Sequence, residues 1–322
     1  MSATTTTPEA LLHRLEWTVL RRLDGLLHGD YRTLFRGHGV DLADLREYQH
    51  SDDVRHIDWN VTARLQTPHV RVYNEERETS AWFLLDLTSS LDFGSGAIKK
   101  GAIATELVGV LARMLSRHGN RVGAVLYSGK VEAVIPAGSG RRHVLHILHR
   151  MLALAEQTRQ PAARRAASAP APSKTRLQDL LQSAGHAIAR RSLLFVVSDF
   201  ISEPGWEKPL AQLSQRHEVL AVRLYDPLEQ DLPDLGFLMM QDAESGEQLF
   251  VDTHDRGFRK RFAALAEARE NALRSAFSHA GVDVLELSTE DHLMDAVLRF
   301  ADLRRRRSSL SAGGVLPKHL EH

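Results

Sequence analysis

The sequence predicts an α/β fold with a mostly parallel, doubly wound sheet and helices on both faces. Between residues 80 and 305, short apolar runs alternate with longer segments in which apolar residues recur at helical spacing. This alternation calls for a parallel sheet whose crossover helices cover both faces. One apolar run is followed directly by Asp86, and another ends in Ser198 and Asp199. Ligands of such folds collect at the carboxyl ends of the strands, so these two positions are the first candidates for a functional site.

The chain divides into four segments. Residues 1–30 carry leucines at helical spacing between basic residues, which predicts an amphipathic helix. Residues 31–79 form a charged, β-containing segment that we expect to pack on the main domain. The main domain spans 80–305, with a flexible excursion at 157–174, where Ala, Pro and Arg replace the apolar period. Residues 306–322 are a polar tail whose last residues resemble the start of a vector-encoded histidine tag.

Periodicity also places the elements of the main domain. The strands expected there are 82–85, 121–127, 131–135, 192–198, 218–225 and 282–287. The helices expected there are 98–119, 144–151, 177–190, 206–216, 255–280 and 290–304. Residues 237–241 and 248–252 are expected to form a hairpin, since Ser245-Gly246 provides a turn between them.

Composition restricts the class of protein. Lys plus Arg equals Asp plus Glu, 41 each, so no net field attracts nucleic acid or an acidic membrane. The absence of cysteine excludes disulfides, thiol nucleophiles and Cys-based zinc sites. The first residues lack the pattern of a signal peptide, and no apolar run approaches the roughly 18 residues of a membrane helix. These observations indicate a cytoplasmic protein without a membrane span.

The first candidate site carries three oxygen-bearing side chains at alternate positions, Asp86, Thr88 and Ser90. A turn at this point would bring the three oxygens together, and oxygen ligands favour Mg²⁺ or Mn²⁺ over Zn²⁺. The alternative is that the hydroxyls cap the helix that follows. Asp199, at the end of a similar strand, supplies a second carboxylate and favours the metal interpretation over the capping one.

Known enzyme motifs fit the sequence poorly. A phosphotransferase of the haloacid-dehalogenase type needs a second carboxylate two residues after Asp86, where a threonine stands. The tripeptide 92–94 spells the metal-binding motif of kinases, but no catalytic-loop His-Arg-Asp precedes it. Residues 94–100 lack the glycine that a phosphate loop requires before its lysine. We therefore expect no enzymatic activity.

Several motifs occur in a fixed order along the chain. They are Asp44-Leu45-Arg46-Glu47-Tyr48, Asp52-Asp53-Val54-Arg55, Ile57-Asp58-Trp59, Thr62-Ala63-Arg64, Val70-Arg71 to Glu75-Glu76-Arg77, the stretch around Asp86, Val197-Ser198-Asp199-Phe200, and Tyr225-Asp226-Pro227 with Leu232-Pro233. With them the chain resembles the family catalogued as domain of unknown function 58, over residues 30–305. The motifs before Asp86 are specific to this family, whereas the Asp-x-Thr-x-Ser pattern marks only a broader superfamily.

The resemblance implies a von Willebrand factor type A-like fold with a metal-ion-dependent adhesion site (MIDAS). In that superfamily the site combines an Asp-x-Ser/Thr-x-Ser loop, a Thr or Ser from a second loop and an Asp from a third. Asp86, Thr88 and Ser90 match the first loop, and Asp199 matches the third. For the second loop the candidate hydroxyl is Ser139, in a position where no threonine stands.

The resemblance further implies a non-enzymatic protein-interaction module. Sites of this kind leave one coordination position open for an acidic side chain of a partner. Members of the family are thought to act as adaptors for AAA+ ATPases of the MoxR type in chaperone-like assembly or activation. We therefore expect Mg²⁺ or Mn²⁺ as the cofactor, and such an ATPase or its client as the partner. Two alternatives stay open: a metal-dependent phosphoester hydrolase, and a structural fold whose site is empty.

Overall fold

The computed structural model describes residues 7–20, 44–49, 54, 57–72, 80–96, 98–159, 175–241 and 248–299. The chain forms two compact units. The larger unit combines residues 1–34 with 79–322, and the smaller one consists of residues 35–78. The segment expected at 31–79 is thus a separate compact unit, and its packing on the main domain stays a prediction.

The smaller unit is built on a two-stranded antiparallel sheet. Strand β1 (Asp44–Glu47) pairs with β2 (His69–Val72), and helix α4 (Trp59–Leu65) lies between them in the sequence. The carboxylate of Asp58 caps this helix by accepting hydrogen bonds from the backbone N–H groups of Asn60 and Val61, at 3.0 and 3.2 Å. The β content expected for this segment is confirmed.

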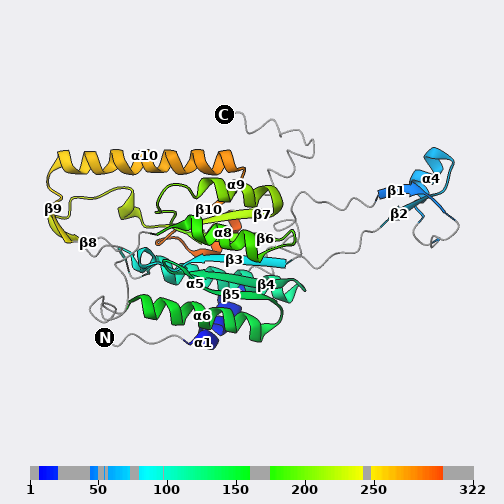
Figure 1. Ribbon diagram of the computed structural model, residues 1–322, viewed down its shortest axis with the longest axis horizontal. Coiled ribbons are helices and arrows are strands. Elements are labelled where there is room, and N and C mark those ends of the chain that lie inside the picture. Colours follow the sequence, from blue (N-terminus) through cyan, green and yellow to red (C-terminus); the bar gives the residue numbers. More distant parts are fainter. Residues whose placement is uncertain are drawn as a thin grey trace. The chain divides into compact units, whose positions relative to one another are not determined.

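The larger unit contains a six-stranded sheet with the order β10-β7-β6-β3-β4-β5 (Figure 1). All neighbouring pairs are parallel except β4 and β5, which are antiparallel. The strands are β3 (Ser80–Asp86), β4 (Arg121–Tyr127), β5 (Val131–Gly138), β6 (Leu193–Ser198), β7 (Glu218–Tyr225) and β10 (Asp283–Ser288). The prediction of a mostly parallel α/β sheet is confirmed.

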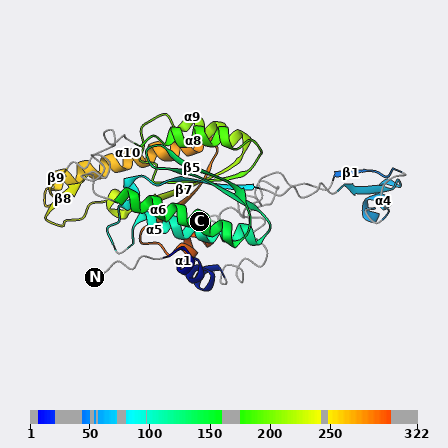
Figure 2. The same ribbon diagram turned by 60° about the horizontal axis from the view of Figure 1, so that its bottom comes forward.

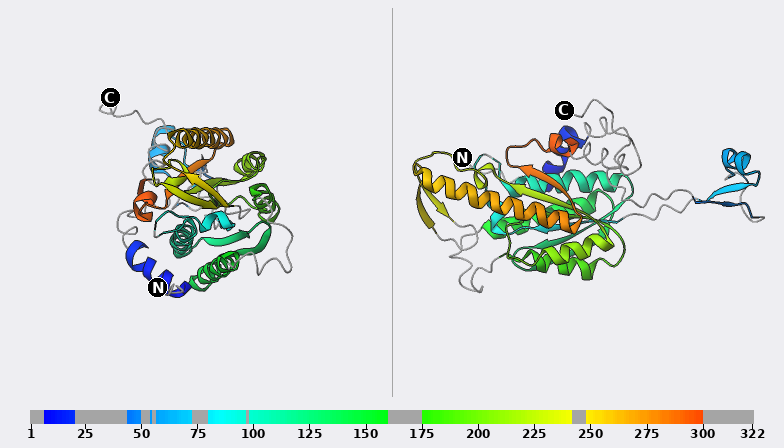
Figure 3. Two further views of the ribbon diagram at one scale, coloured as in Figure 1. Left: turned by 90° about the vertical axis from the view of Figure 1, so that its left-hand side faces the viewer. Right: turned by 90° about the horizontal axis from the view of Figure 1, so that it is seen from above.

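Helices cover both faces of this sheet. One group comprises α1 (Pro8–Leu15), α5 (Lys100–Arg117) and α6 (Arg141–Arg159), and the other comprises α8 (Leu177–Ala187), α9 (Glu207–Arg216) and α10 (Arg256–Ala280). Figures 2 and 3 show the two groups on opposite sides of the strands. The central strands are therefore buried on both sides, which explains their continuous apolar sequence.

Alternate residues of each strand serve the two helical layers. Trp82, Leu84 and Val196 belong to the cluster that packs with α8, α9 and α10. Phe83 and Phe195, one residue out of phase, stack on each other with ring centroids 4.9 Å apart. This double-sided core fixes the register of β3 and β6, and with it the positions of Asp86 and Asp199.

Several helices end at residues other than those predicted from the sequence periodicity. The first helix, α1, continues as a π-helix, Glu16–Leu20, and the rest of the helix expected up to residue 29 lies outside the described residues. Helix α6 extends to Arg159, and the remainder of the excursion 157–174 and the polar tail 306–322 also lie outside them. The hairpin is confirmed as β8 (Phe237–Gln241) against β9 (Gln248–Asp252). No helix in the described part of the chain is long and apolar enough to cross a membrane.

Candidate functional site

The site lies where the order of the strands reverses. From β3 the chain moves to β4 on one side, whereas from β6 it moves to β7 and then β10 on the other. Because β3 and β6 are adjacent and parallel, their carboxyl ends open a crevice at the switch point, the usual binding position in doubly wound sheets. Asp86 ends β3 and Asp199 follows β6, so both carboxylates stand at this point.

Asp86 is a buried carboxylate held mainly by hydroxyl groups. Its Oδ2 accepts a hydrogen bond from Ser198 Oγ at 2.7 Å. Its Oδ1 accepts from Thr88 Oγ1 at 2.8 Å and, less closely, from the Thr88 backbone N–H at 3.3 Å. Burial, together with the nearby carboxylate of Asp199, raises the pKa of Asp86 to about 6. Among the described residues, no Lys, Arg or His forms an ion pair with Asp86.

The loop after β3 gathers three oxygens, as the spacing predicts. Thr88 precedes the short 3₁₀ helix Ser89–Asp92, and its hydroxyl lies 3.2 Å from Ser90 Oγ. Both side chains are buried. Within the described residues the Thr88 hydroxyl makes no capping hydrogen bond to this helix, and α5 begins at Lys100 without a side-chain cap. The oxygens are thus turned toward Asp86, and the capping interpretation is wrong.

Asp199 forms a buried ion pair with Lys100, a residue that no sequence motif marks. Lys100 Nζ donates to Asp199 Oδ2 at 2.8 Å and to Glu229 Oε1 at 2.7 Å, and its side chain is 1% exposed. The ring of Phe93 lies over the same ammonium group, 5.7 Å from its centroid. Burial alone lowers the pKa of Lys100, but the two carboxylates outweigh it and raise the pKa above its ordinary value. The lysine therefore stays charged and joins the start of α5 to the loops after β6 and β7.

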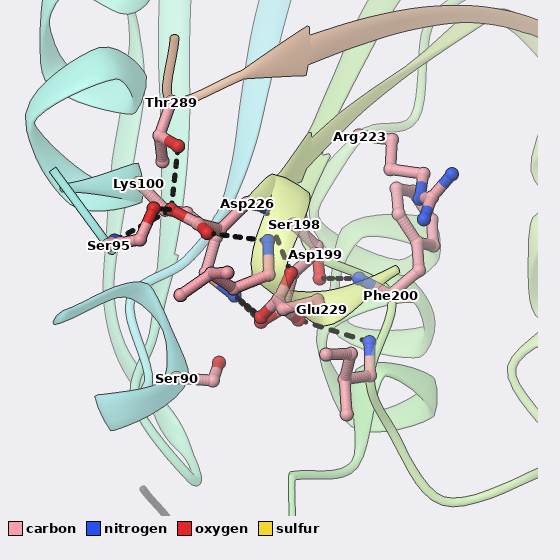
Figure 4. Close-up of polar contacts among 12 residues, drawn as sticks. Ser90, Ser95, Lys100, Ser198, Asp199, Phe200, Arg223, Asp226, Glu229 and Thr289 are labelled. Atoms are coloured by element: carbon pink, nitrogen blue, oxygen red, sulfur yellow. Dashed lines mark hydrogen bonds and ion pairs between the residues drawn. The ribbon is translucent and has the colours of Figure 1, made fainter. Parts of the chain in front are cut away.

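A second buried carboxylate network stands at the same edge, around Asp226 (Figure 4). Asp226 Oδ2 accepts from the Ser95 backbone N–H and Oγ, at 2.8 and 2.9 Å, and from Thr289 Oγ1 at 2.7 Å. Its Oδ1 accepts from the Leu228 backbone N–H at 3.0 Å. Burial raises the pKa of Asp226, but these hydrogen bonds outweigh it and hold the pKa below its usual value.

The loop after β6 is held in an uncommon backbone conformation. Phe200 has φ of 57°, in the left-handed region that bulky residues rarely adopt. Its backbone N–H donates to Ser198 Oγ at 2.9 Å, and its ring packs on Trp206 and Phe277 with centroids 5.4 and 4.9 Å away. The aromatic packing compensates for this conformation, which aligns Ser198 with Asp86 and Asp199 with Lys100.

Ser139 does not belong to the site. It follows β5, which runs antiparallel to β4, so that Gly138 pairs with Val122 whereas Tyr127 pairs with Asp86. Five residues of strand separate the two positions, or roughly 16 Å at the usual rise per residue. The exposed Ser139 lies at the opposite edge of the sheet from Asp86, and its assignment as a ligand is corrected.

Thr175 is a buried hydroxyl-bearing residue that the sequence motifs did not single out. It is 1% exposed and stands just before α8. The next residue, Arg176, donates its backbone N–H to Tyr127 Oη at 3.2 Å, and Tyr127 is the register partner of Asp86 in the sheet. The Thr175 carbonyl accepts hydrogen bonds from Ser202 Oγ and the Glu203 backbone N–H in the loop after β6. These contacts place Thr175 near the carboxyl ends of β4 and β6.

The donor set suits a hard cation. It consists of two carboxylates, Asp86 and Asp199, and the hydroxyls of Thr88 and Ser90, all of which are oxygen ligands. Within the described ranges, no three His, Cys, Asp or Glu side chains come together as a metal cluster. Oxygen donors of this kind are the ones that Mg²⁺ and Mn²⁺ prefer, whereas structural zinc sites use nitrogen and sulfur. In the structure the two Asp199 oxygens accept hydrogen bonds from Lys100 Nζ and from the Ile201 backbone N–H.

Sequence comparison identifies relatives over most of the chain. Residues 44–272 match the family described as "Protein of unknown function DUF58". Uncharacterized proteins of Mycobacterium tuberculosis and Mycobacterium bovis are 35% identical over 299 residues, which cover 92% of this chain and 90% of theirs.

Two solved structures show a more distant similarity. An aerotolerance-related membrane protein from Bacteroides fragilis is 10% identical, with a TM-score of 0.41, and covers 71% of this chain and 99% of its own. BatB from Bacteroides thetaiotaomicron, a conserved hypothetical protein, is 11% identical, with a TM-score of 0.40 and the same coverage. Similarity at this level does not identify a function.

Proposed function

The chain belongs to the family of unknown function DUF58. From its site we propose a protein-interaction module that binds a partner through a Mg²⁺- or Mn²⁺-dependent adhesion site. The observation that carries the proposal is Asp86. It is a buried carboxylate that faces a second carboxylate, has two hydroxyls beside it and forms no ion pair within the described chain.

In this proposal, residues from two strands would hold the ion. Asp86, Thr88 and Ser90 would hold the ion on the β3 side, and Asp199 would face it from the β6 side, directly or through water. Thr175 replaces Ser139 as the second-loop hydroxyl in this proposal. Bound there, the metal would supply a positive charge with an open coordination position that an acidic side chain of a partner can fill.

The ion pairs of Lys100 offer a way to transmit binding. Its ammonium group bridges Asp199 and Glu229, and Lys100 is the first residue of α5. A ligand that shifts Asp199 therefore acts on the start of α5 and on the loop after β7 at the same time. This connection is suited to an adaptor, in which occupation of the site changes the orientation of a helix.

We propose a MoxR-type AAA+ ATPase of the same cytoplasm, or its client, as the partner. The direct test is to measure binding of the purified chain to such an ATPase from the same source, by biolayer interferometry, in Mg²⁺ and in EDTA. We expect EDTA and Asp86→Asn each to weaken binding at least about tenfold, equivalent to about 1.4 kcal/mol. The matched control is Asp92→Asn, which changes a partly exposed carboxylate of the same loop that pairs with Lys99.

The outcomes separate the alternatives. Binding that survives both EDTA and Asp86→Asn contradicts a metal-mediated contact. Mg²⁺-dependent hydrolysis of p-nitrophenyl phosphate that Asp86→Asn abolishes would replace the interaction module with a phosphoester hydrolase.

A further inference from the structure

The β8–β9 hairpin exposes apolar side chains on both of its faces. Met239 pairs with Phe250 on one face and Met240 pairs with Leu249 on the other. Their exposed fractions are 62, 71, 36 and 64%, respectively, and Val251 alone among the hairpin side chains that the structure describes is buried. In Figure 1 the hairpin lies at one end of the larger unit, beyond the six-stranded sheet. Nothing in the described part of the larger unit covers these four side chains.

The exposed apolar area is large for one small element. Six of the thirteen exposed large apolar side chains among the described residues lie here, and we call them the hairpin surface. They are Leu235, Phe237, Met239, Met240, Leu249 and Phe250. Together they expose on the order of 600–700 Å², since a large side chain presents about 150–250 Å². A stable protein–protein contact covers about 800 Å² per partner, and the two faces of the hairpin together approach this area.

The hairpin also leaves backbone groups open. A two-stranded sheet has two edge strands, and neither β8 nor β9 pairs with another described strand. Isolated two-stranded hairpins are at best marginally stable in water, because too little apolar surface is buried. Phe237 and Phe250 pack only loosely on each other, with ring centroids 6.3 Å apart. Association with a protein surface would therefore stabilise the hairpin as well as bury its side chains.

Charges beside the hairpin surface are of both signs. Asp252 shares a face with Phe237, its register partner. Arg256 and Lys260 follow in the first turns of α10, and all three charged side chains are exposed and form no ion pair with another described residue. A patch that carries apolar groups, an acid and bases together is complementary to itself when a two-fold axis relates two copies. An anionic lipid surface, in contrast, would be repelled by Asp252.

We infer that the hairpin surface is a self-association site, at which a second copy of this chain packs its own β8–β9 hairpin. The two hairpins are related by a two-fold axis, so that the apolar faces meet and Asp252 of each copy approaches Lys260 of the other. The contact uses no residue of the candidate metal site, so it does not depend on the proposed interaction with a partner protein.

The test is the mass of the full chain in solution, measured by sedimentation velocity from about 1 to 100 µM, a range that detects micromolar dissociation constants. We expect a dimer that EDTA does not dissociate. Phe237→Ser with Phe250→Ser should weaken dimerisation at least about tenfold. The control is Val134→Ser, which removes a partly exposed apolar side chain of β5, away from the hairpin, and should leave the dimer intact. Unchanged circular dichroism would show that the variants fold.

A charge exchange tests the two-fold arrangement directly. Lys260→Asp places like charges opposite each other and should weaken the dimer, whereas Lys260→Asp combined with Asp252→Lys should restore it. A wild-type chain that stays monomeric at about 100 µM overturns the proposal. Co-sedimentation of that monomer with phosphatidylglycerol vesicles, lost in the Phe237→Ser, Phe250→Ser variant, would identify lipid as the occupant instead.

Discussion

Asp86 and Asp226 are two buried carboxylates at the same edge of one sheet, and they differ in how their charge is stabilised. Asp226 accepts two close backbone N–H donors and two hydroxyls, which lower its pKa in spite of burial. Asp86 accepts two hydroxyls and one long backbone bond, and it faces Asp199, so its pKa is raised. The protein thus stabilises the charge of Asp226 with its own donors and stabilises the charge of Asp86 less well.

The largest effect is expected from Lys100, the cation that this edge does contain. Lys100→Met leaves Asp199 and Glu229 buried or half-buried without their common partner. Loss of one partner of a buried ion pair costs about 3–5 kcal/mol, which urea denaturation would measure. Lys99→Met removes an exposed pair with Asp92 and should cost less than about 1 kcal/mol. Equal losses in the two variants would show that Lys100 is not a structural cation.

Asp226→Asn tests the carboxylate that the chain completes by itself. The amide offers one acceptor oxygen and no charge to the donors of Ser95, Leu228 and Thr289. We expect the free energy of unfolding to fall by about 2–3 kcal/mol, since hydrogen bonds to a charged group are being lost. Asp231→Asn, at an exposed position of the following loop, is the control. If Asp226→Asn left the free energy of unfolding unchanged, the proposed difference between the two carboxylates would be contradicted.

In the absence of metal, Asp86→Asn should raise the free energy of unfolding, whereas Asp226→Asn lowers it. The substitution removes a buried charge that lies beside another carboxylate, so in EDTA at neutral pH we expect the chain to become more stable by about 1–3 kcal/mol. Thermal unfolding in EDTA gives the direct comparison. A variant less stable than the wild type would mean that the hydroxyls of Thr88 and Ser198 already satisfy the charge.

The smallest effect is a pH dependence specific to Asp86. Because its folded pKa of about 6 exceeds the ordinary value of 3.8, the folded state binds the proton more tightly. Its contribution to stability in EDTA therefore increases as pH falls, by about 1.4 kcal/mol between pH 7 and pH 5. This increment should appear in the difference between wild type and Asp86→Asn. A difference that stays constant with pH would contradict the raised pKa.

The sequence was sufficient to locate the strand ends that carry Asp86 and Asp199. Both follow uninterrupted apolar runs, and burial on two faces leaves such strands little freedom in register. Ser139 lies at the other edge of the sheet because β5 runs antiparallel to β4. The three residues 128–130 that join β4 to β5 are too few for a parallel crossover, and this was the available signal.

The sequence alone indicates only some of the features of Lys100 and Thr175. Lys100 stands three and seven residues before Ile103 and Leu107, on the buried stripe of α5, so the helical period marks it as an unusual buried cation. Its partners Asp199 and Glu229 depend on tertiary contacts that no local pattern shows. Thr175 follows the excursion of low apolar content, and its position near the strand ends depends on tertiary hydrogen bonds, from Arg176 to Tyr127 and from Ser202 to Thr175.

The most direct test of the account is calorimetric titration of the full chain with Mg²⁺ near pH 7.5, compared with Asp86→Asn and Asp92→Asn. We expect saturable binding of one ion per chain in the wild type and in Asp92→Asn, and none in Asp86→Asn. Binding should also raise the stability of the first two chains, because a ligand that binds only the folded state stabilises it. No binding by the wild type at about 10 mM Mg²⁺, far above the range of functional metal affinities, or equal binding by Asp86→Asn, would contradict a metal site at Asp86.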